Sequence, residues 1–471
     1  MMIRLLNKEE IAEIYHKKMP QDFAKGEIKP LERILMLRES GKYLCYGIFE
    51  YLNGTEKMVS YCFCVTSEAK DAVLLDYFAV SGDIRGKGYG SRCFAMLKEE
   101  IRKKELGNLI LEVENPRFGI DPWDRELRRR RIAFYIRNGM TLTHLRIFLY
   151  DVEYLVMTED SGQLFQTADQ IYHTYQVLLK PDKLKSKLSI STNIRCIATD
   201  LDRTILNEQG KLSEHTTKVI KAAMENGIGL IIASGRAYDT LPAEIAEIAK
   251  TQYAITSNGA VVSQNGECIR RSFLKEDGAE ALLKEYLQAK ERFLITMEVF
   301  WQGRAYCDKE YYEHPERFGS QKAAEYVRTT RNAVDDMGGF VKEHKKELES
   351  ISFISAQKDE REKLKQKLTN EIKGISITSS IEHLIEITPE GVSKGTSLKW
   401  LLEQIGIEPE ECLAFGDGDN DADMLAYAGI GIAVENASDT AKNAANYVTK
   451  SHKSEGVGIV VEEILQILQK E

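Results

Sequence analysis

The chain has 471 residues, 43% of them hydrophobic and 29% charged, a composition typical of a globular protein with several domains. Its formal net charge of −9 argues against a nucleic-acid partner or an anionic membrane surface. No apolar run reaches the roughly 18 residues of a membrane span, and acidic residues follow the N-terminus too early for a signal peptide. The eight cysteines are scattered without metal-ligand spacing, so we expect a cytoplasmic protein.

The first 150 residues contain two strand-like segments, at 57–65 and 72–80, the second rich in β-branched and aromatic residues. A glycine-rich turn and a helical stretch at 93–103 follow, and the turn reads Arg85-Gly86-Lys87-Gly88-Tyr89-Gly90-Ser91. Such a turn presents free backbone N–H groups and the positive end of the helix dipole, which favours phosphate binding. The glycines taken alone fit an ordinary tight turn equally well.

A strand-like segment at 109–114 and a basic helix at 128–138 come next, and the end of the helix reads Arg130-Arg131-Ile132-Ala133-Phe134-Tyr135-Ile136-Arg137-Asn138-Gly139-Met140. Together with the glycine-rich turn, this helix resembles the GNAT family of acyl-CoA N-acyltransferases over about residues 1–150. The resemblance implies an α+β fold for this domain.

The GNAT resemblance also implies acetyl-CoA as a cosubstrate between two splayed strands, and an amine as the acceptor. The turn at 85–91 would bind the cofactor, with backbone amides of 85–90 on its pyrophosphate. The backbone of Val80 would accept a hydrogen bond from the pantetheine, and Tyr135 would protonate the departing thiolate. A tyrosine packed on its helix is the alternative for Tyr135. Asp76 and Glu114 are candidates for the general base by strand position only, and each fits an ordinary polar residue as well.

The segment between the two halves is predicted to close the first domain. A strand is expected at 150–157 and a helix at 168–179. The lysines and serines of 181–193 are typical of an interdomain linker. We therefore expect residues 151–192 to contain a closing strand, a helix and a linker.

The second half begins with an apolar run, Cys196 to Ala198, that stops at Asp200 and Asp202. Alternate residues of a strand share a face, so these two carboxylates leave the strand on the same side. Like charges this close need a cation or a shared proton, and Mg²⁺ prefers oxygen ligands of this kind. Taken alone, the pair would fit a solvated loop about as well.

Three further apolar runs end at polar residues: at Ser234-Gly235-Arg236, at Thr256-Ser257-Asn258-Gly259, and at Gly416-Asp417-Gly418-Asp419-Asn420-Asp421. Short strands that alternate with helices predict a parallel sheet with helices on both faces, which binds ligands at the carboxyl ends of its strands. The sequence therefore predicts a magnesium-assisted phosphoryl-transfer site at one crevice. Its members would be Asp200, Asp202, Ser234, Asn258, Asp417 and Asp421.

These residues resemble the haloacid dehalogenase (HAD) superfamily, and within it the Cof-type phosphatases, over about residues 193–471. The motifs are DxDxT at 200–204, the ASGR serine at 234, TSNGA at 256–260, GVSKG around Lys394 and GDGDNDADML from 416. The resemblance implies a Rossmann-like parallel sheet. Arg203 departs from the family, which usually has glycine there; it either tightens the turn or places a cation near the phosphate.

The HAD resemblance implies that Asp200 attacks phosphorus and carries an aspartyl-phosphate. Asp202 would protonate the leaving alkoxide and later deprotonate the attacking water. Mg²⁺ would be held by Asp200, by Asp417 and by the backbone carbonyl of Asp202. Asp421 would orient these ligands. The phosphoryl oxygens would be bound by Ser234, Lys394, Asn258 and Asn420. We expect Asp419 and Asp423 to be ordinary turn and helix residues.

About 120 residues separate the first part of this domain from the second, too many for one crossover. We therefore predict core segments at 193–262 and 382–471 with an inserted α/β cap at 263–381. In Cof-type proteins such a cap selects the substrate. Four aromatic residues would line its pocket or simply pack at the domain seam: Trp301, Tyr306, Tyr311 and Tyr312.

The sequence thus predicts a bifunctional cytoplasmic enzyme. One half would be a Mg²⁺-dependent phosphatase acting on small phosphate esters, and the other an acetyl-CoA-dependent N-acyltransferase. The alternatives are a phosphatase regulated by a non-catalytic acetyl-CoA-binding domain, a phosphomutase that uses the same aspartyl-phosphate, and a non-catalytic scaffold.

Overall fold

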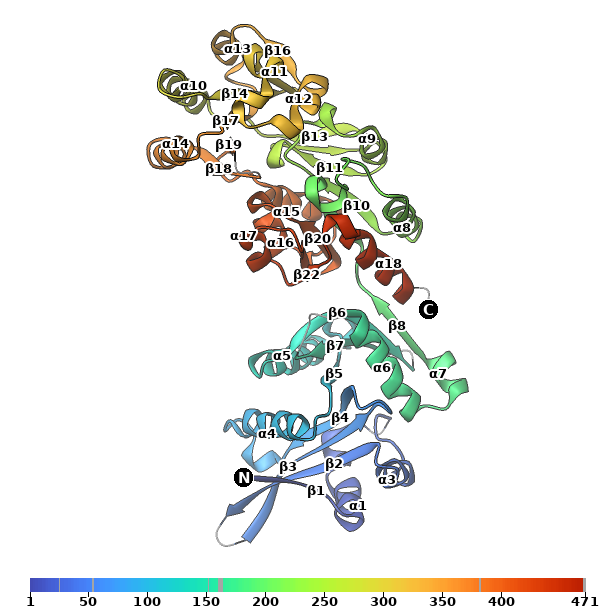
Figure 1. Ribbon diagram of the computed structural model, residues 1–471. Coiled ribbons are helices and arrows are strands. Elements are labelled where there is room, and N and C mark those ends of the chain that lie inside the picture. The colour runs from blue at the N-terminus through green and yellow to red at the C-terminus, as the bar shows by residue number, and fades with distance from the viewer. Residues whose placement is uncertain (25, 53–54, 151, 160–163, 381–382, 469–471) are drawn as a thin grey trace. The chain divides into compact units, whose positions relative to one another are not determined.

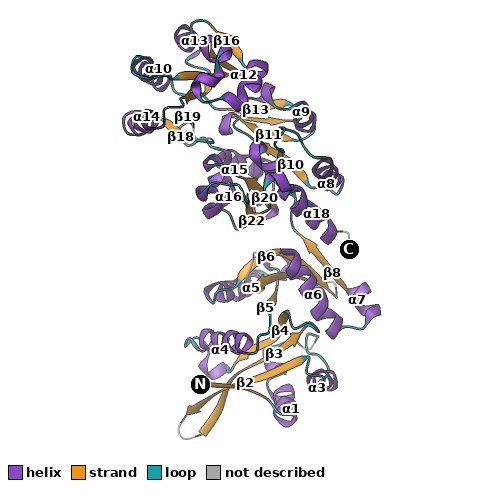
Figure 2. Cartoon of the chain, viewed as in Figure 1, coloured by secondary structure: helices purple, strands orange, loops and turns teal. Residues whose placement is uncertain are grey.

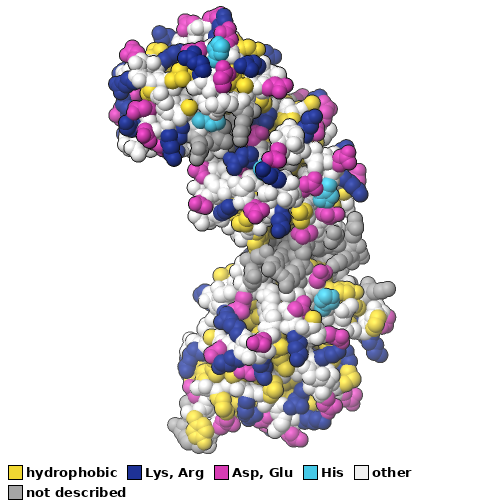
Figure 3. Space-filling view, in the orientation of Figure 1, with side chains coloured by type: hydrophobic (Ala, Val, Ile, Leu, Met, Phe, Trp, Pro, Cys, Tyr) yellow, Lys and Arg dark blue, Asp and Glu magenta, His cyan; other side chains and the backbone are white. Residues whose placement is uncertain are grey.

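The computed structural model describes residues 1–24, 26–52, 55–150, 152–159, 164–380 and 383–468. The chain divides into two compact units, one spanning Met1–Asn193 with residues 466–468, the other Ile194–Leu465. Both units combine helices and strands (Figure 2). None of the helices in the described ranges is long and apolar enough to cross a membrane. On the face shown in Figure 3, acidic and basic side chains are interspersed.

An eight-stranded sheet organises the first unit, in the order β1-β2-β3-β4-β5-β7-β6-β8 (Figure 1). Its strands are β1 (Met2–Leu5), β2 (Tyr43–Leu52), β3 (Thr55–Thr66), β4 (Ala72–Val80), β5 (Asn108–Glu114), β6 (Thr141–Leu149), β7 (Val152–Thr158) and β8 (Leu188–Thr192). Neighbouring strands pair antiparallel except β4 and β5, which are parallel. The parallel pair needs a crossover connection, and helix α4 provides it.

Helices cover both faces of this sheet. On one face, Phe94 of α4 and Tyr135 of α5 share an apolar cluster with Leu109 of β5. On the other face, the Tyr175 hydroxyl of α6 donates to the Glu112 carboxylate of β5, at 2.8 and 2.7 Å. The helices of the unit are α1 (Lys8–Lys17), α2 (Met19–Asp22), α3 (Leu31–Glu39), α4 (Tyr89–Lys103), α5 (Pro122–Arg137), α6 (Leu164–Leu178) and α7 (Pro181–Lys187).

Two segments of the first unit differ from the sequence-based prediction. Helix α5 begins at Pro122 rather than at 128, because the Asp121 side chain caps it by accepting from the Asp124 N–H at 2.7 Å. The predicted linker at 181–193 instead contains α7 and β8, and β8 pairs with β6. Leu188 and Ile190 alternate with serines, so pairing buries both apolar side chains.

A second eight-stranded sheet forms the core of the other unit, in the order β13-β12-β11-β10-β9-β20-β21-β22. The strands are β9 (Cys196–Thr199), β10 (Gly229–Ala233), β11 (Tyr253–Thr256), β12 (Val261–Gln264), β13 (Glu267–Arg271), β20 (Cys412–Gly416), β21 (Ile430–Val434) and β22 (Tyr447–Thr449). From β11 to β22 every pair is parallel, which confirms the predicted parallel sheet. The helices are α8 (Glu214–Glu225), α9 (Ala243–Ala249), α15 (Lys394–Ile405), α16 (Ala422–Tyr427), α17 (Asp439–Ala444) and α18 (Gly456–Leu468).

A six-stranded sheet in the order β16-β15-β14-β17-β19-β18 forms the inserted cap. Its strands are β14 (Thr296–Trp301), β15 (Arg304–Asp308), β16 (Asn332–Val334), β17 (Leu348–Ile354), β18 (Ile375–Thr378) and β19 (Leu384–Pro389). The helices are α10 (Glu276–Lys290), α11 (Lys309–Glu313), α12 (Ala324–Thr330), α13 (Met337–His344) and α14 (Lys358–Glu371).

The sequence predicted an inserted cap at 263–381, and the pairing of strands gives it different boundaries. The β12–β13 hairpin extends the edge of the core sheet, so the core continues through β13. Strand β19 pairs with β17 in the cap sheet, so the cap continues through β19. The second predicted boundary, at 381–382, lies outside the described residues.

Candidate active site

Four neighbouring parallel strands end at one edge of the core sheet, and a polar side chain comes just after each. Asp200 follows β9, Ser234 follows β10, Asn258 follows β11 and Asp417 follows β20. These strands are consecutive neighbours in the sheet, so their carboxyl ends adjoin. The parallel topology therefore brings together residues that are far apart in the sequence.

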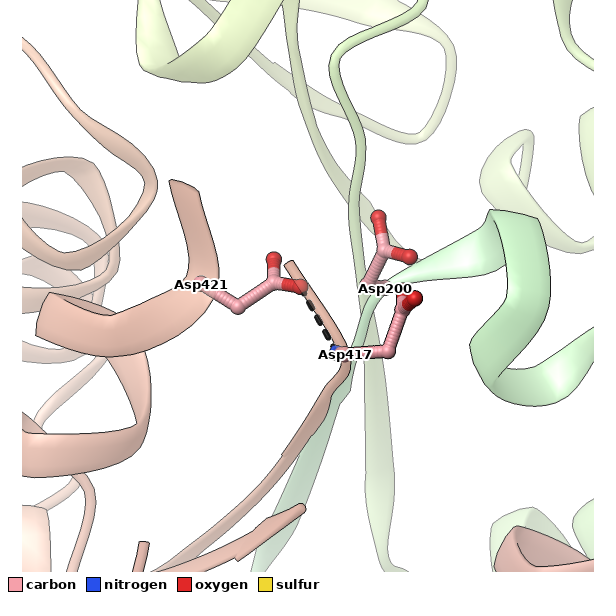
Figure 4. Close-up of side chains that lie close together, drawn as sticks. All are labelled: Asp200, Asp417 and Asp421. Atoms are coloured by element: carbon pink, nitrogen blue, oxygen red, sulfur yellow. Dashed lines mark hydrogen bonds between the residues drawn. The ribbon is translucent and has the colours of Figure 1, made fainter. Parts of the chain in front are cut away.

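Asp200, Asp417 and Asp421 form a buried cluster in which one oxygen of each lies within 4.8 Å of the others. Figure 4 shows Asp200 and Asp417 at adjoining strand ends, with Asp421 pointing toward Asp417. The Oδ2 atom of Asp421 accepts hydrogen bonds from the backbone N–H groups of Asp417 and Gly418, at 2.9 and 2.8 Å. Only 6%, 6% and 1% of the three residues is exposed, so their charges need compensation. Carboxylate oxygens at this spacing fit Mg²⁺.

Lys394 supplies one compensating charge. Its Nζ lies 2.6 Å from Asp200 Oδ1 and 2.6 Å from Asp421 Oδ1. Burial alone would lower the pKa of Lys394, but the two carboxylates raise it above its ordinary value, so the ammonium stays charged. Burial raises the pKa of Asp200 well above its usual range; Lys394 opposes this rise, and Asp421 and Asp417 add to it. Lys394 thus contacts two of the three acids and leaves Asp417 to other partners.

Asp417 is held from two sides. The Thr204 hydroxyl donates to Asp417 Oδ1 at 3.1 Å, and Arg203 Nε lies 3.5 Å from Asp417 Oδ2. Burial, and next Asp421, raise the pKa of Asp417 to about 6, against the opposing effect of Arg203. Arg203 itself adopts φ of +62°, in the left-handed region that favours glycine.

The predicted phosphate-binding residues surround this cluster, all of them buried. Asn420 Nδ2 donates to Asn258 Oδ1 at 2.9 Å, and Asn258 Nδ2 donates to Glu386 Oε1 of the cap strand β19 at 2.8 Å. Ser234 Oγ accepts the Arg236 N–H at 3.2 Å. Glu386 was not identified from the sequence, since nothing local marks a cap carboxylate as a neighbour of the core loops.

Two nearby acids lie apart from the cluster. The Ser438 hydroxyl donates to Asp419 at 2.7 Å, and the Gly395 N–H donates to Asp423 at 3.3 Å. Both carboxylates thus serve local turn and helix contacts, as expected for Asp419 and Asp423.

Asp202 leaves the strand near Asp200 but is bound by Arg236. The guanidinium donates to both carboxylate oxygens, from Nε at 2.7 Å and from Nη2 at 2.6 Å. It also lies 4.4 Å from the ring centroid of Tyr326 in the cap, and Arg331 lies 4.8 Å from the same ring. Arg331 in turn donates to both oxygens of Glu298. Only Arg236 could have been found from the sequence, as the last residue of the ASGR motif.

A cavity of about 650 Å³ lies between the core residues and the cap. Asp200, Asp202, Ser234 and Asp417 line it from the core. The cap contributes polar and aromatic side chains, which include Glu298, Tyr311, Ser320, Tyr326, Arg331, Ser352 and Glu386.

Of the four aromatic residues expected either to line this cavity or to pack at the domain seam, Tyr311 lines it. Trp301 and Tyr306 instead pack against Phe340, at ring-centroid distances of 6.0 and 4.7 Å. Tyr312 packs against the apolar cluster around Phe318. Trp301 alternates along β14 with Phe300, which faces the cavity, so Trp301 points to the other face of the cap sheet.

The glycine-rich turn of the first unit leads into α4 as predicted. Gly86 and Gly88 have φ of +79° and +78°, and Gly88 caps the helix. Strands β4 and β5 pair only from Ala72 to Leu75 and from Asn108 to Leu111, so their later residues are not paired with each other. The Val80 carbonyl, predicted to bind pantetheine, accepts from Arg85 Nε at 2.9 Å.

Tyr135 is 9% exposed, and its ring packs edge-on against Phe94 and Phe134, at 5.4 and 5.2 Å between centroids. Burial raises the pKa of Tyr135 to about 12. The residue is therefore part of the apolar core as well as a candidate acid.

Both candidate bases of the first unit are engaged in ion pairs. Lys29 Nζ lies 2.7 Å from Asp76, and Glu114 contacts Arg128 at 3.1 Å and Arg131 at 3.0 Å. A third acid, Glu112, was missed by the sequence analysis. Burial raises the pKa of Glu112 to about 7, and it follows directly on the last β4–β5 pair. Strand alternation alone gave no sign that the Tyr175 hydroxyl donates to this carboxylate.

Residues 197–461 match the family of haloacid dehalogenase-like hydrolases. The chain is 30% identical over 288 residues to the 5-amino-6-(5-phospho-D-ribitylamino)uracil phosphatase YwtE of Bacillus subtilis, covering 58% of this chain and 98% of that protein. It is 27% identical over 290 residues to the phosphatase YwpJ of the same organism, covering 58% and 100%. A solved haloacid dehalogenase-like hydrolase from B. subtilis superposes with a TM-score of 0.50 at 26% identity, covering 57% and 99%.

Proposed function

This chain belongs to the haloacid dehalogenase-like hydrolase family, and we propose that its second unit is a Mg²⁺-dependent phosphatase of the Cof type that hydrolyses small phosphate esters. The observation that carries the proposal is the position of Asp200. It is a buried carboxylate at a strand end, it is held by Lys394, and it opens onto a cavity much larger than a phosphoryl group.

In the proposed reaction an Asp200 oxygen attacks phosphorus and the ester bond to the leaving alkoxide breaks. Asp202 gives the alkoxide a proton, then takes one from the water that cleaves the aspartyl-phosphate and restores Asp200. Lys394 is hydrogen-bonded to Oδ1 of Asp200, which leaves Oδ2 for the attack. Ser234, Asn258 and Lys394 place N–H, N⁺–H or O–H donors around the phosphoryl oxygens.

A bound Mg²⁺ would be held by Asp200, the Asp202 carbonyl and Asp417, where it would offset the repulsion between nucleophile and phosphate. Asp421 orients this group by its hydrogen bonds to the Asp417 N–H and to Lys394. Since one relative is a phosphatase of 5-amino-6-(5-phospho-D-ribitylamino)uracil, we propose phosphorylated sugars, sugar alcohols and their conjugates as the first substrates to test.

The direct test is phosphate release from a panel of metabolite phosphates by the full chain, with Mg²⁺ or with EDTA. The proposal expects release that needs Mg²⁺. A phosphomutase would instead move the phosphoryl group to a second sugar hydroxyl and release little phosphate. A scaffold would do neither, and either of these results would refute the proposal.

For the first unit we propose a second function, acetyl-CoA-dependent N-acylation of an amine. The separation of β4 from β5 beyond Leu75 and Leu111 favours it, because the backbone groups of 76–80 are then not used by β5. The turn at 85–91 adds N–H groups at the start of α4, where an anionic pyrophosphate would be stabilised. A cofactor between the strands would have to displace Arg85 from the Val80 carbonyl.

Acetyl-CoA binding by calorimetry, followed by transfer to a panel of amines, tests this second function. Tyr135→Phe should keep binding and lose transfer, because the thiolate no longer receives its proton. Tyr46→Phe is a matched control, since Tyr46 lies in the same apolar cluster and also loses a buried hydroxyl. Binding without transfer in the unmodified protein would mean a non-catalytic acetyl-CoA-binding domain.

A further inference from the structure

We propose that Arg203 makes the phosphatase selective for esters that carry a second anionic group, a phosphate or a carboxylate, in the leaving part of the molecule. This inference rests on the proposed phosphatase function. Arg203 lines the cavity beside the acidic cluster, as do Arg236 and Arg331. The three arginines differ in how many of their donors are already used.

Arg236 and Arg331 each make three hydrogen bonds to protein groups, two of them to one carboxylate. Arg236 donates to both oxygens of Asp202 and, from Nη1, to the Thr240 carbonyl at 3.1 Å. Arg331 donates to both oxygens of Glu298 and, from Nη1, to the Thr330 hydroxyl at 3.0 Å. Each guanidinium would have to break a two-point ion pair before it could bind a ligand, and such pairs are the strong ones.

Arg203 is different, because its contacts are few and long. Among the described residues it makes one side-chain hydrogen bond, from Nη2 to the Asn436 carbonyl at 3.3 Å, and its Nε lies 3.5 Å from Asp417 Oδ2. Its side chain is 51% exposed. A 3.5 Å ion pair whose arginine is half-exposed holds the guanidinium weakly, so a ligand anion can compete for it.

The position of the Arg203 backbone, from which the side chain extends, is nevertheless well defined. The left-handed region disfavours non-glycine residues, and Arg203 lies there at φ of +62°. Asn436 Nδ2 donates to the Arg203 carbonyl at 2.9 Å, and His452 Nδ1 lies 2.8 Å from Asn436 Oδ1. The turn that carries Arg203 is therefore held in place by the hydrogen bond from Asn436.

The reacting phosphoryl group already has its own cation. Lys394 is buried against Asp200, and a phosphoryl group attacked by Asp200 would lie beside it. Arg203 is half-exposed and lines the cavity together with cap residues, so its guanidinium is available to the leaving part of a substrate in that cavity. Among the described cap residues that line this cavity, the acidic and basic side chains are those of Glu298, His383 and Glu386, together with Arg331, which is already paired. A planar guanidinium with free donors matches a carboxylate or phosphate in two-point geometry.

The test measures binding to the full chain carrying Asp200→Asn, with two matched pairs of ligands. One pair is a hexose monophosphate and its bisphosphate; the other is glycerol phosphate and phosphoglycerate. We expect the member of at least one pair that carries the second anionic group to bind tenfold or more tightly than its partner, and Arg203→Gly to remove that difference. A bisphosphate preference alone assigns a phosphate, and a phosphoglycerate preference alone assigns a carboxylate.

Arg203→Lys should keep part of the preference, since lysine keeps the positive charge but cannot form the two-point contact of a guanidinium. Arg195→Gln is the control: that side chain is also 51% exposed and pairs with Glu411 at 3.2 Å, away from the cavity, so the preference should stay. Equal binding within both pairs would overturn the proposal. So would Arg203→Gly weakening both members of a pair equally, which would place Arg203 on the reacting phosphoryl group. Failure of the phosphatase itself is separate, because it appears as no phosphate release from any ester.

Discussion

Arg236 holds Asp202 with two hydrogen bonds of 2.7 and 2.6 Å, and the same guanidinium lies against the ring of Tyr326 in the cap. Asp202 is the proposed proton donor to the leaving group, and 51% of its side chain is exposed. A half-exposed carboxylate would otherwise sample several rotamers. The two-point contact fixes its direction, and the stacking on Tyr326 couples that direction to the position of the cap.

Arg236→Ala should therefore lower kcat by about 10–100-fold for alkyl phosphates, because misplacing a general acid forfeits part of its typical 10²–10⁴-fold effect. For an aryl phosphate such as p-nitrophenyl phosphate the loss should be smaller, since its leaving group needs little protonation. Steady-state kinetics on both ester types measure this ratio. Arg304→Ala is the control, a cap arginine whose contact with Asp239 is 3.9 Å long. Equal losses for both ester types would contradict a role through Asp202.

Lys394→Met should destabilise the metal-free second unit by about 3 kcal/mol, because removing one partner leaves buried carboxylates uncompensated. Added Mg²⁺ should restore part of this loss, since it returns positive charge to Asp200. Hydrogen-exchange protection of β9 and β20 amides, with Mg²⁺ or with EDTA, measures the effect. Equal destabilisation under both conditions would mean that the metal does not bind at this cluster.

Mg²⁺ affinity should fall as the pH drops below about 6. Burial raises the pKa of Asp417 to about 6, so protons compete with the metal for this carboxylate below that pH. Well below pH 6, the Mg²⁺ affinity should fall by close to tenfold for each further pH unit. Calorimetric titration of Mg²⁺ across the range measures it. Asp419→Asn should leave the profile unchanged, because Asp419 accepts from Ser438 outside the cluster; a flat profile in the unmodified protein would contradict the assignment of Asp417.

Glu112 should make the first unit less stable as the pH rises. Burial raises its pKa from 4.5 to about 7, so the folded state binds more protons than the unfolded state between these values. The stability contribution is complete below about pH 4.5 and is lost as the pH rises through 7, by up to about 3 kcal/mol. Hydrogen exchange of β5 amides measures this slope.

Glu112→Gln should flatten that slope, while Glu114→Gln, two residues further along the same strand, should keep it. Stability that increases from pH 5 to 7 in both the unmodified protein and the Glu114 variant would contradict the raised pKa of Glu112.

Features with a local signal were predictable from the sequence. The apolar run before Asp200 and Asp202 indicated a buried strand, and the alternation of strands and helices indicated the parallel sheet that brings Asp200 close to Asp417. The boundaries of β4 follow its β-branched and aromatic residues. In each case the information lies within a few neighbouring residues.

Features that depend on tertiary packing were not predictable. Nothing near Arg236 indicates that its side chain meets Asp202, 34 residues earlier, or that Tyr326 of the cap lies against it. The face of the cap sheet that covers the cavity is likewise set by strand register, which is why Trp301 turns away while Phe300 faces it. The segment around Ile190 has a weak apolar alternation, and only its pairing with β6 makes it a strand.

The most direct test of the central claim is single-turnover hydrolysis of a substrate ester, quenched in acid and analysed by mass spectrometry of the peptide that contains Asp200. The account predicts a transient adduct with the mass of one phosphoryl group on Asp200, formed with Mg²⁺ and absent in Asp200→Asn. Full turnover by Asp200→Asn, or an adduct on another residue, would show that Asp200 is not the nucleophile.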